Sequence, residues 1–197
     1  SLTNFVLSNK ATSFILMKSL GFEPKRTMPL VQKTTLTRLF KHHKNKAMAY
    51  KGRVFLLPDE FTTYNDTHIG IKAVELLEHL GYEVLIPKIS ESGRTYISKG
   101  LIRTAKRLAN KNIELLSTLV SANEPIIGIE PSAILSFRDE YPELATTENK
   151  ESAIALSKNS LLFEEFFMQE VAKGNIDKSD FKHGKRLIKL HGHCQRS

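Results

Sequence analysis

The densest group of metal-ligating residue types lies near the end of the chain. The stretch HGHC places His191 and His193 two residues apart, directly before Cys194. Imidazole nitrogens and thiolate sulfurs are ligands that zinc and other transition metals bind in proteins. Four consecutive residues supply at most two or three ligands of a tetrahedral site. The stretch therefore indicates either one corner of a metal site or a histidine pair hydrogen-bonded to neighbouring loops.

Two other short stretches carry polar residues that could take part in chemistry. In SESGRT, Gly93 permits an unusual turn, and Arg94 could clamp a carboxylate or a partner's acidic residue. An ordinary surface loop is the alternative for this stretch. In IEPSA, Glu130 could be a general base, a ligand, or an acid that stabilises a helix N-terminus through the helix dipole. No phosphate-binding loop, dinucleotide glycine fingerprint or nucleophile elbow is present, which disfavours those enzyme classes.

Short apolar runs predict the strands that position these stretches. A nearly continuous apolar run is typical of a strand covered on both faces. Four such runs occur: RVFLL (53–57), YEVLIP (82–87), PIIGI (125–129) and RLIKL (186–190).

Between the predicted strands, apolar residues recur at the spacing of a helix, and this helical spacing predicts the connecting helices. It covers 69–80, 101–120 and 152–174, with Gly81 and Gly174 at two helix ends and Pro131 at a helix start. Strands that alternate with helices predict an α/β fold with a parallel-rich sheet of about four strands flanked by helices. Ligands of such sheets bind at the carboxyl ends of the strands. We therefore expect PDEFTTYND, SESGRT, IEPSA and HGHC to share one rim.

The positive charge of the chain belongs to one segment. The net charge is +8, yet nine of the 29 basic residues lie between Pro24 and Pro58, where there is no acid. The rest of the chain has 20 basic and 21 acidic residues, a net charge of −1. The segment could contact phosphates, an anionic membrane or an acidic partner domain, or it could be a solvated linking arm. No aromatic platform accompanies the charge, which disfavours nucleic acid.

Composition narrows the class of protein. Hydrophobic residues make up 41% and charged residues 25%, as in soluble globular proteins. No apolar run approaches the ~20 residues that cross a bilayer, and the first residues make a poor signal peptide. A single cysteine excludes an internal disulfide framework and fits a reducing compartment. We expect a cytoplasmic protein, with peripheral membrane contact through the basic segment as an option.

Several longer motifs, in this order, resemble a known family. They are FTTYND, SGRTYISKGLIRTAKRLANKNIELL, IEPSAILSFRDEYPEL, LLFEEFFMQEV and LHGHC. Together they resemble the cysteine-rich (CCG-type) iron–sulfur domain of FAD-linked oxidases related to D-lactate and D-2-hydroxyglutarate dehydrogenases. That domain is similar to iron–sulfur subunits of heterodisulfide reductase and glycerol-3-phosphate dehydrogenase. The resemblance covers about residues 8–194.

The resemblance implies a division of the chain. Residues 1–50 would be a helical, basic arm linking a ferredoxin-like part to this domain. Residues 51–197 would be the first half of the cysteine-rich-type α/β domain, with a second repeat expected to follow. The FAD-binding domain of the parent protein would lie outside this chain.

The chain departs from the family at the ligand positions. Where the family reads CCGRP, Glu91 and Ser92 stand in place of two cysteines, and Ala133 replaces a third in EPSA. Of these ligand positions, only Cys194 keeps its cysteine. Serine and glutamate are poorer iron ligands than thiolate, and alanine cannot ligate. The resemblance therefore implies an iron–sulfur cluster for the family, and the replacements make a normal cluster unexpected in this chain.

Three hypotheses remain from the sequence. The first is an electron-transfer domain that relays electrons from FAD-dependent oxidation of a 2-hydroxy acid to an acceptor. There, Cys194, His191 and His193 would touch a metal, while Arg94 and Glu130 would shape a cofactor pocket. The second is a non-redox docking module with a degenerate metal site, whose partners are the FAD-binding and ferredoxin-like domains. The third is a metal-dependent hydrolase that uses His191, His193 and Glu130.

Overall fold

The computed structural model describes residues 2–23, 25–44, 50–89 and 91–182, together with 184, 187 and 189. Three predicted metal ligands, His191, His193 and Cys194, lie outside the described residues. Most of the strand predicted at 186–190 does so too, and the two residues of that range that are described lie in no helix or strand.

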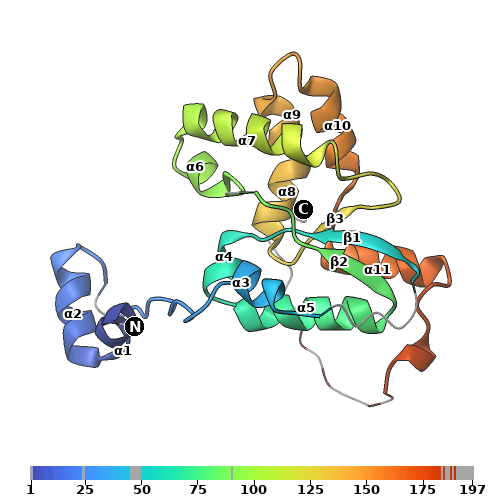
Figure 1. Cartoon of the computed structure of the whole chain (residues 1–197). Coiled ribbons are helices and arrows are strands. Elements are labelled where there is room, and N and C mark those ends of the chain that lie inside the picture. The colour runs from blue at the N-terminus through green and yellow to red at the C-terminus, as the bar shows by residue number, and fades with distance from the viewer. Residues whose placement is uncertain are drawn as a thin grey trace.

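The centre of the molecule is a sheet of four parallel strands, which confirms the predicted fold class (Figure 1). In chain order the strands are β1 (Gly52–Leu56), β2 (Tyr82–Leu85), β3 (Ile126–Gly128) and β4 (Ser160–Leu162). Their spatial order is β2-β1-β3-β4. The first three strands match predicted apolar runs, because β-branched and aromatic residues there pack on both faces of the sheet.

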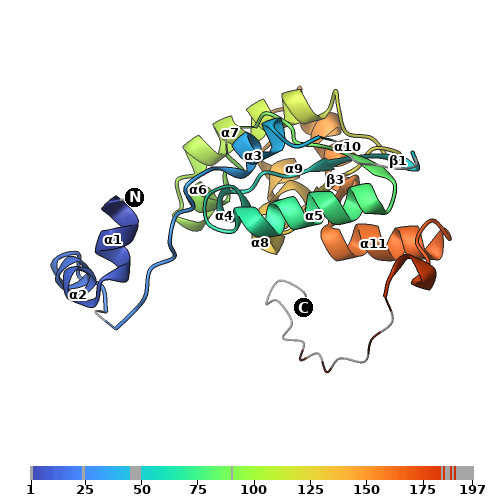
Figure 2. The same cartoon turned by 60° about the horizontal axis from the view of Figure 1, so that its bottom comes forward.

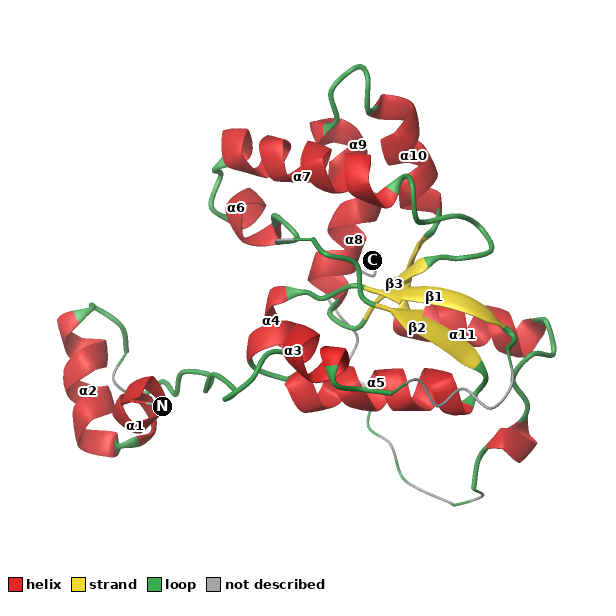
Figure 3. Cartoon of the chain, viewed as in Figure 1, coloured by secondary structure: helices red, strands yellow, loops and turns green. Residues whose placement is uncertain are grey.

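Helices cover both faces of the sheet, giving three layers (Figures 1 and 3). The helices that follow β1 are α4 (Glu60–Tyr64), α5 (Thr67–His79), α6 (Arg94–Ser98), α7 (Ile102–Leu116), α8 (Pro131–Arg138), α9 (Glu140–Leu144), α10 (Lys150–Lys158) and α11 (Phe163–Ala172), and then a short 3-10 helix (Lys178–Asp180). Helix α8 begins at Pro131, as predicted, because proline suits the first helical turn. Gly81 and Gly174 follow helix ends with positive φ angles of 97° and 76°.

Side-chain alternation along β1 divides the core between the two faces. Val54 and Leu56 pack with residues of α5 and α11, whereas Phe55 and Leu57 pack with residues of α7, α8, α9 and α10. Successive residues of a strand point to opposite faces, so a continuous apolar run is required where both faces are covered.

The described part of the N-terminal region contains three helices, α1 (Leu2–Ser8), α2 (Lys10–Ser19) and α3 (Leu36–Lys41). The side chain of Asn4 holds the backbone of Val31 through two hydrogen bonds of 2.7 and 3.1 Å, while α1 and α2 stand away from the sheet (Figure 2). Helix α3 is different, because Leu36 is fully buried in the core beside α5. The predicted domain division at residue 50 stays a prediction.

The single helix predicted over 152–174 is wrong. The chain leaves α10 at Asn159, forms β4 and enters α11 directly. The Ser160 hydroxyl donates to the Leu156 carbonyl at 2.8 Å, which satisfies an end carbonyl of α10. The apolar stripe is consequently split, since Leu162 packs in one half of the core and Phe166 in the other.

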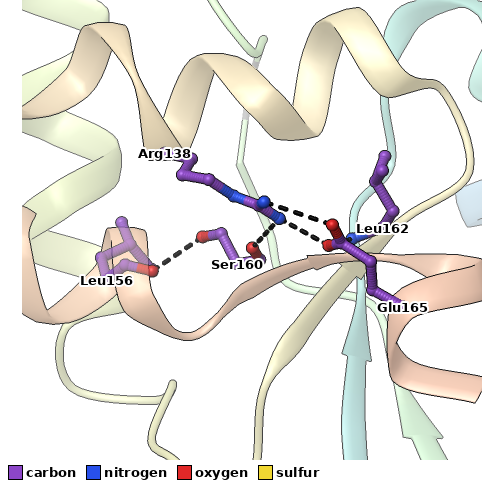
Figure 4. Close-up of polar contacts among 5 residues, drawn as sticks. All are labelled: Arg138, Leu156, Ser160, Leu162 and Glu165. Atoms are coloured by element: carbon purple, nitrogen blue, oxygen red, sulfur yellow. Dashed lines mark hydrogen bonds and ion pairs between the residues drawn. The ribbon is translucent and has the colours of Figure 1, made fainter. Parts of the chain in front are cut away.

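An arginine on α8 holds β4 and α11 together (Figure 4). The Arg138 guanidinium donates to both oxygens of Glu165, at 3.3 and 2.6 Å, and to the Ser160 carbonyl at 3.1 Å. The same Glu165 carboxylate accepts from the Leu162 backbone N–H at 3.0 Å. This forked contact fixes the start of α11 relative to α8.

Within the described ranges, no helix is both long and apolar enough to cross a membrane.

Candidate functional site

The predicted rim brings the start of α4, which follows β1, into direct contact with the loop after β2. The Glu60 carboxylate, which follows β1, accepts hydrogen bonds from the Ser92 N–H at 2.8 Å and from the Ser92 hydroxyl at 3.0 Å. The strands β1 and β2 are adjacent and parallel, so the loops after them leave the same edge of the sheet. Sequence reasoning did not single out Glu60, because nothing local indicates which residue would meet Ser92.

Two buried side chains hold the Ser92 loop from behind. The Tyr141 hydroxyl, on α9, donates to the Ser92 carbonyl at 2.7 Å. The Asn112 amide, on α7, donates to the Glu91 carbonyl at 2.8 Å and to the Tyr141 oxygen at 2.9 Å. Tyr141 is completely buried, and burial raises the pKa of its hydroxyl. Tyr141 therefore acts here as a neutral hydrogen-bonding group, and the loop is fixed by both neighbouring helices.

Asp59 is a nearly buried carboxylate at the end of β1, only 1% exposed. One oxygen accepts from the Thr62 N–H at 2.9 Å and caps α4. The other has no hydrogen-bond partner among the described residues. Burial raises the pKa of Asp59, and the nearby carboxylates of Glu130 and Glu60 raise it further, while the bonds to Thr62 oppose them. The Asp59 carboxyl therefore loses its proton less readily than an exposed aspartate would.

The two predicted cofactor-binding residues occupy different local environments. Glu130 caps α8, with its side chain accepting from the Ala133 N–H at 2.7 Å. Of the three roles expected for Glu130, this geometry is that of the helix-stabilising acid. The roles of general base and ligand stay predictions.

Arg94 begins α6 directly after Gly93, whose φ of 81° is the turn expected there. The Arg94 N–H donates to the Ser92 hydroxyl at 3.2 Å, and the guanidinium donates to Ser98. Its Nε is buried without a partner in the described part of the chain. Burial raises the pKa of Glu140, and the charge of Arg94 opposes that rise. A cofactor-binding role for Arg94 stays a prediction.

The described rim residues do not fit an iron–sulfur cluster. Ser92 and Ala133, which stand at cysteine positions of the resembled family, are 0% and 2% exposed. The Ser92 hydroxyl is already bonded to Glu60, and Ala133 has no donor atom. Within the described residues, no group of three or more histidine, cysteine or acidic side chains is arranged to hold a metal ion. The metal role predicted for His191, His193 and Cys194 stays a prediction.

Comparisons with known proteins find relatives of two kinds. The D-2-hydroxyglutarate dehydrogenase of Escherichia coli (strain K12) is 29% identical over 119 residues, which cover 60% of this chain and 12% of that protein. The D-2-hydroxyglutarate dehydrogenase of Haemophilus influenzae is 26% identical over 151 residues, covering 71% of this chain and 14% of that protein. One subunit of the anaerobic glycerol-3-phosphate dehydrogenase of Escherichia coli (strain K12) is 28% identical over 173 residues, covering 76% of this chain and 44% of that protein.

No protein-family model matches the chain, and no solved structure matches it. The chain spans about an eighth of the length of the D-2-hydroxyglutarate dehydrogenases and less than half of the glycerol-3-phosphate dehydrogenase polypeptide. The similarities confirm the resemblance predicted from the motifs: the chain is similar to a segment of D-2-hydroxyglutarate dehydrogenases and to part of an anaerobic glycerol-3-phosphate dehydrogenase.

Proposed function

We propose that this chain is a domain of an FAD-dependent oxidoreductase that oxidises a 2-hydroxy acid, and that it serves there as a docking module. The flavin and the catalytic chemistry would lie in a domain outside this chain. The similarity to two kinds of dehydrogenase supports the oxidoreductase context. The partners would be the FAD-binding and ferredoxin-like domains of the parent protein and an electron acceptor. We place the protein in the cytoplasm, with its basic segment available for peripheral membrane contact.

The contact between Glu60 and Ser92 carries the docking proposal. A hydroxyl at a position where the family has a ligand cysteine is bonded to a carboxylate at the start of α4. Tyr141 and Asn112 then fix the Ser92 loop from the core side. Such a network gives the rim a single rigid shape without any ligand. A rigid polar rim is suited to positioning a partner domain, because little conformational freedom is lost on binding.

A second candidate is the electron relay. The similarity to part of an anaerobic glycerol-3-phosphate dehydrogenase and the retained Cys194 favour it. In that case Cys194, His191 and His193 would hold a metal centre, and any further ligands would come from outside the described rim. The Glu60–Ser92 contact would then be a neighbouring structural feature of the same domain.

A single substitution in the full-length parent protein separates the two candidates. If the chain is a docking module, Cys194→Ser leaves iron content and the rate of acceptor reduction unchanged. If it is a relay, iron content and acceptor reduction fall together, while reduction of the flavin by the 2-hydroxy acid continues at the same rate. D-2-hydroxyglutarate should be among the 2-hydroxy acids tested. If none of them reduces the flavin, both candidate functions are contradicted.

A further inference from the structure

A cleft of about 520 Å³ opens at the amino ends of the strands, on the opposite edge of the sheet from the rim. Its walls include the start of β1, Tyr82 at the start of β2, the residues before β3 and Asn159 before β4. The second half of α11 and Asn175 complete the lining. A volume of this size is within the range of small-molecule sites. None of the residues predicted from the sequence to form a site lies in this cleft.

The floor of the cleft is a buried polar network centred on Glu170. Its carboxylate is only 6% exposed and accepts hydrogen bonds from the Tyr82 hydroxyl at 2.5 Å, the Asn175 amide at 2.7 Å and the Lys173 ammonium at 2.7 Å. Three donors from different parts of the chain hold this carboxylate, so the floor has a fixed geometry. The acid at the bottom is therefore occupied by the protein's own donors.

The mouth of the cleft carries positive charge that no acid among the described residues neutralises by an ion pair. Four basic residues line the cleft against two acids, Glu124 and Glu170. Two of the four basic residues are already paired, Arg53 with Glu124 and Glu83, and Lys173 with Glu170.

Lys51 and Lys158 are the remaining cations, and both are exposed. The Lys51 ammonium donates to the Asn175 carbonyl at 2.6 Å, which leaves its charge uncompensated. The Lys158 side chain has no hydrogen bond or ion pair with any residue that the structure describes.

We propose that this cleft binds a small organic anion that carries phosphate or carboxylate groups. Lys51 and Lys158 would contact its charged groups, because ammonium groups are strong donors to both kinds of oxyanion. The side-chain amides of Asn123 and Gln169 would bond its polar body. The site is separate from the carboxyl rim and does not depend on any metal or flavin in the parent protein.

Titration of the 197-residue chain with pyrophosphate and with citrate, at constant ionic strength, tests this site. Backbone NMR signals of Gly52, Asn123 and Asn175 would report binding at the cleft. We expect saturable shifts at these amides for at least one probe, with a Kd of about 1 mM or tighter. Saturation by pyrophosphate alone would identify phosphate as the preferred group, and saturation by citrate alone would identify carboxylate.

Three matched variants give the specificity control. Lys51→Ala and Lys158→Ala should each weaken binding about tenfold, which corresponds to the loss of one charged contact. Lys111→Ala removes the same charge from the exposed face of α7, away from the cleft, and should change the affinity less than twofold. Equal weakening by all three variants, shifts spread over the basic segment, or no saturation up to about 10 mM would overturn the proposal.

Discussion

Asp59 and Glu170 are both nearly buried carboxylates, and they lie at opposite edges of the same sheet. Asp59 follows β1 at the carboxyl rim and leaves one oxygen without a partner among the described residues. Glu170 lies below the amino-end cleft and accepts three hydrogen bonds. The pKa of Asp59 is raised by burial, whereas the donors around Glu170 outweigh its burial and lower its pKa. The three donors to Glu170 therefore reverse the direction in which burial alone would shift its pKa, whereas the fewer donors to Asp59 do not.

The two edges also differ in how closely they are packed. At the rim, the start of α4 is bonded to the loop after β2, and Tyr141 and Asn112 hold that loop. At the amino edge the polar network lies at the floor, and a cleft stays open above it. We therefore expect changes at the rim to act mainly on stability, and changes at the mouth of the cleft to act mainly on binding.

A glycine pair tests the difference in packing and should give the largest effect. A Cβ atom added at Gly128, at the carboxyl end of β3, would lie 2.4 Å from the Cβ of Ile134. At Gly52, which starts β1 in the cleft, the nearest atom would be 3.9 Å away, on Tyr82. Gly128→Ala should cost about 3 kcal/mol of unfolding free energy, and Gly52→Ala less than about 1 kcal/mol. Urea unfolding measures the unfolding free energy of both variants. Equal losses would show that Gly128 and Gly52 are packed equally tightly.

The two buried acids should respond to pH in opposite directions. Because the folded pKa of Glu170 is lowered, its stabilising contribution is present above the unfolded pKa and is lost as the pH falls through the folded pKa. Because the folded pKa of Asp59 is raised, its contribution is present below the unfolded pKa and is lost as the pH rises through the folded pKa.

Glu170→Gln should therefore destabilise the chain by about 2 kcal/mol at neutral pH, and the difference from the wild type should shrink in acid. Asp59→Asn keeps a side chain that can cap α4, and it should lose less stability than the wild type when the pH is raised from acidic to neutral. Urea unfolding across this pH range provides the measurement. Parallel curves for the wild type and both variants would show that neither acid has the assigned shift.

Ser92→Ala tests the contact between the start of α4 and the loop after β2. The variant removes the hydroxyl that donates to Glu60 and accepts from the Arg94 N–H, but it keeps the Ser92 N–H bond to the Glu60 carboxylate. We expect a loss of about 1 kcal/mol. Ser117→Ala, at an exposed helix end on the far part of α7, is the matched control and should cost less than about 0.5 kcal/mol. A Ser92 variant as stable as the control would mean that the contact does not hold the rim.

Breaking the contact between Arg138 of α8 and Glu165 of α11 should give the smallest loss of stability, because both side chains are partly exposed. Arg138→Lys keeps the charge but cannot bond both oxygens of Glu165 and the Ser160 carbonyl together. The side chains of Arg138 and Glu165 are 34% and 33% exposed, so the loss should stay below about 1 kcal/mol and should diminish at high salt. Thermal unfolding at two salt concentrations checks this. A loss independent of salt would assign the role of Arg138 to packing.

Much of the sheet could be predicted from the sequence. Continuous apolar runs marked β1, β2 and β3 because both faces of these strands are covered. The strand β4 was missed because Ser160–Leu162 is short and lies between two helical patterns of the same period. Leu36 gave no local sign that it would be buried beside α5, since only the tertiary fold places it there.

The candidate site could be predicted only as a set of loops. Parallel topology required the loops after the strands to share an edge, and the structure brings Glu60 and Ser92 together there. Which side chains would pair was decided by three-dimensional contacts between distant segments. The amino-end cleft was missed because parallel topology directs attention to the carboxyl ends of the strands, although an acid among the apolar residues of α11, Glu170, was a usable signal.

The central claim is that the described part of the carboxyl rim is held together by hydrogen bonds, and that its residues do not fit an iron–sulfur cluster. Iron and acid-labile sulfide content, with a visible absorption spectrum, should be measured on the 197-residue chain purified without oxygen. We predict no stoichiometric iron or sulfide and no cluster absorption, with identical results for Cys194→Ser. Stoichiometric iron and sulfide in the wild-type chain, lost in Cys194→Ser, would contradict this claim and would establish the HGHC stretch as part of a working redox centre.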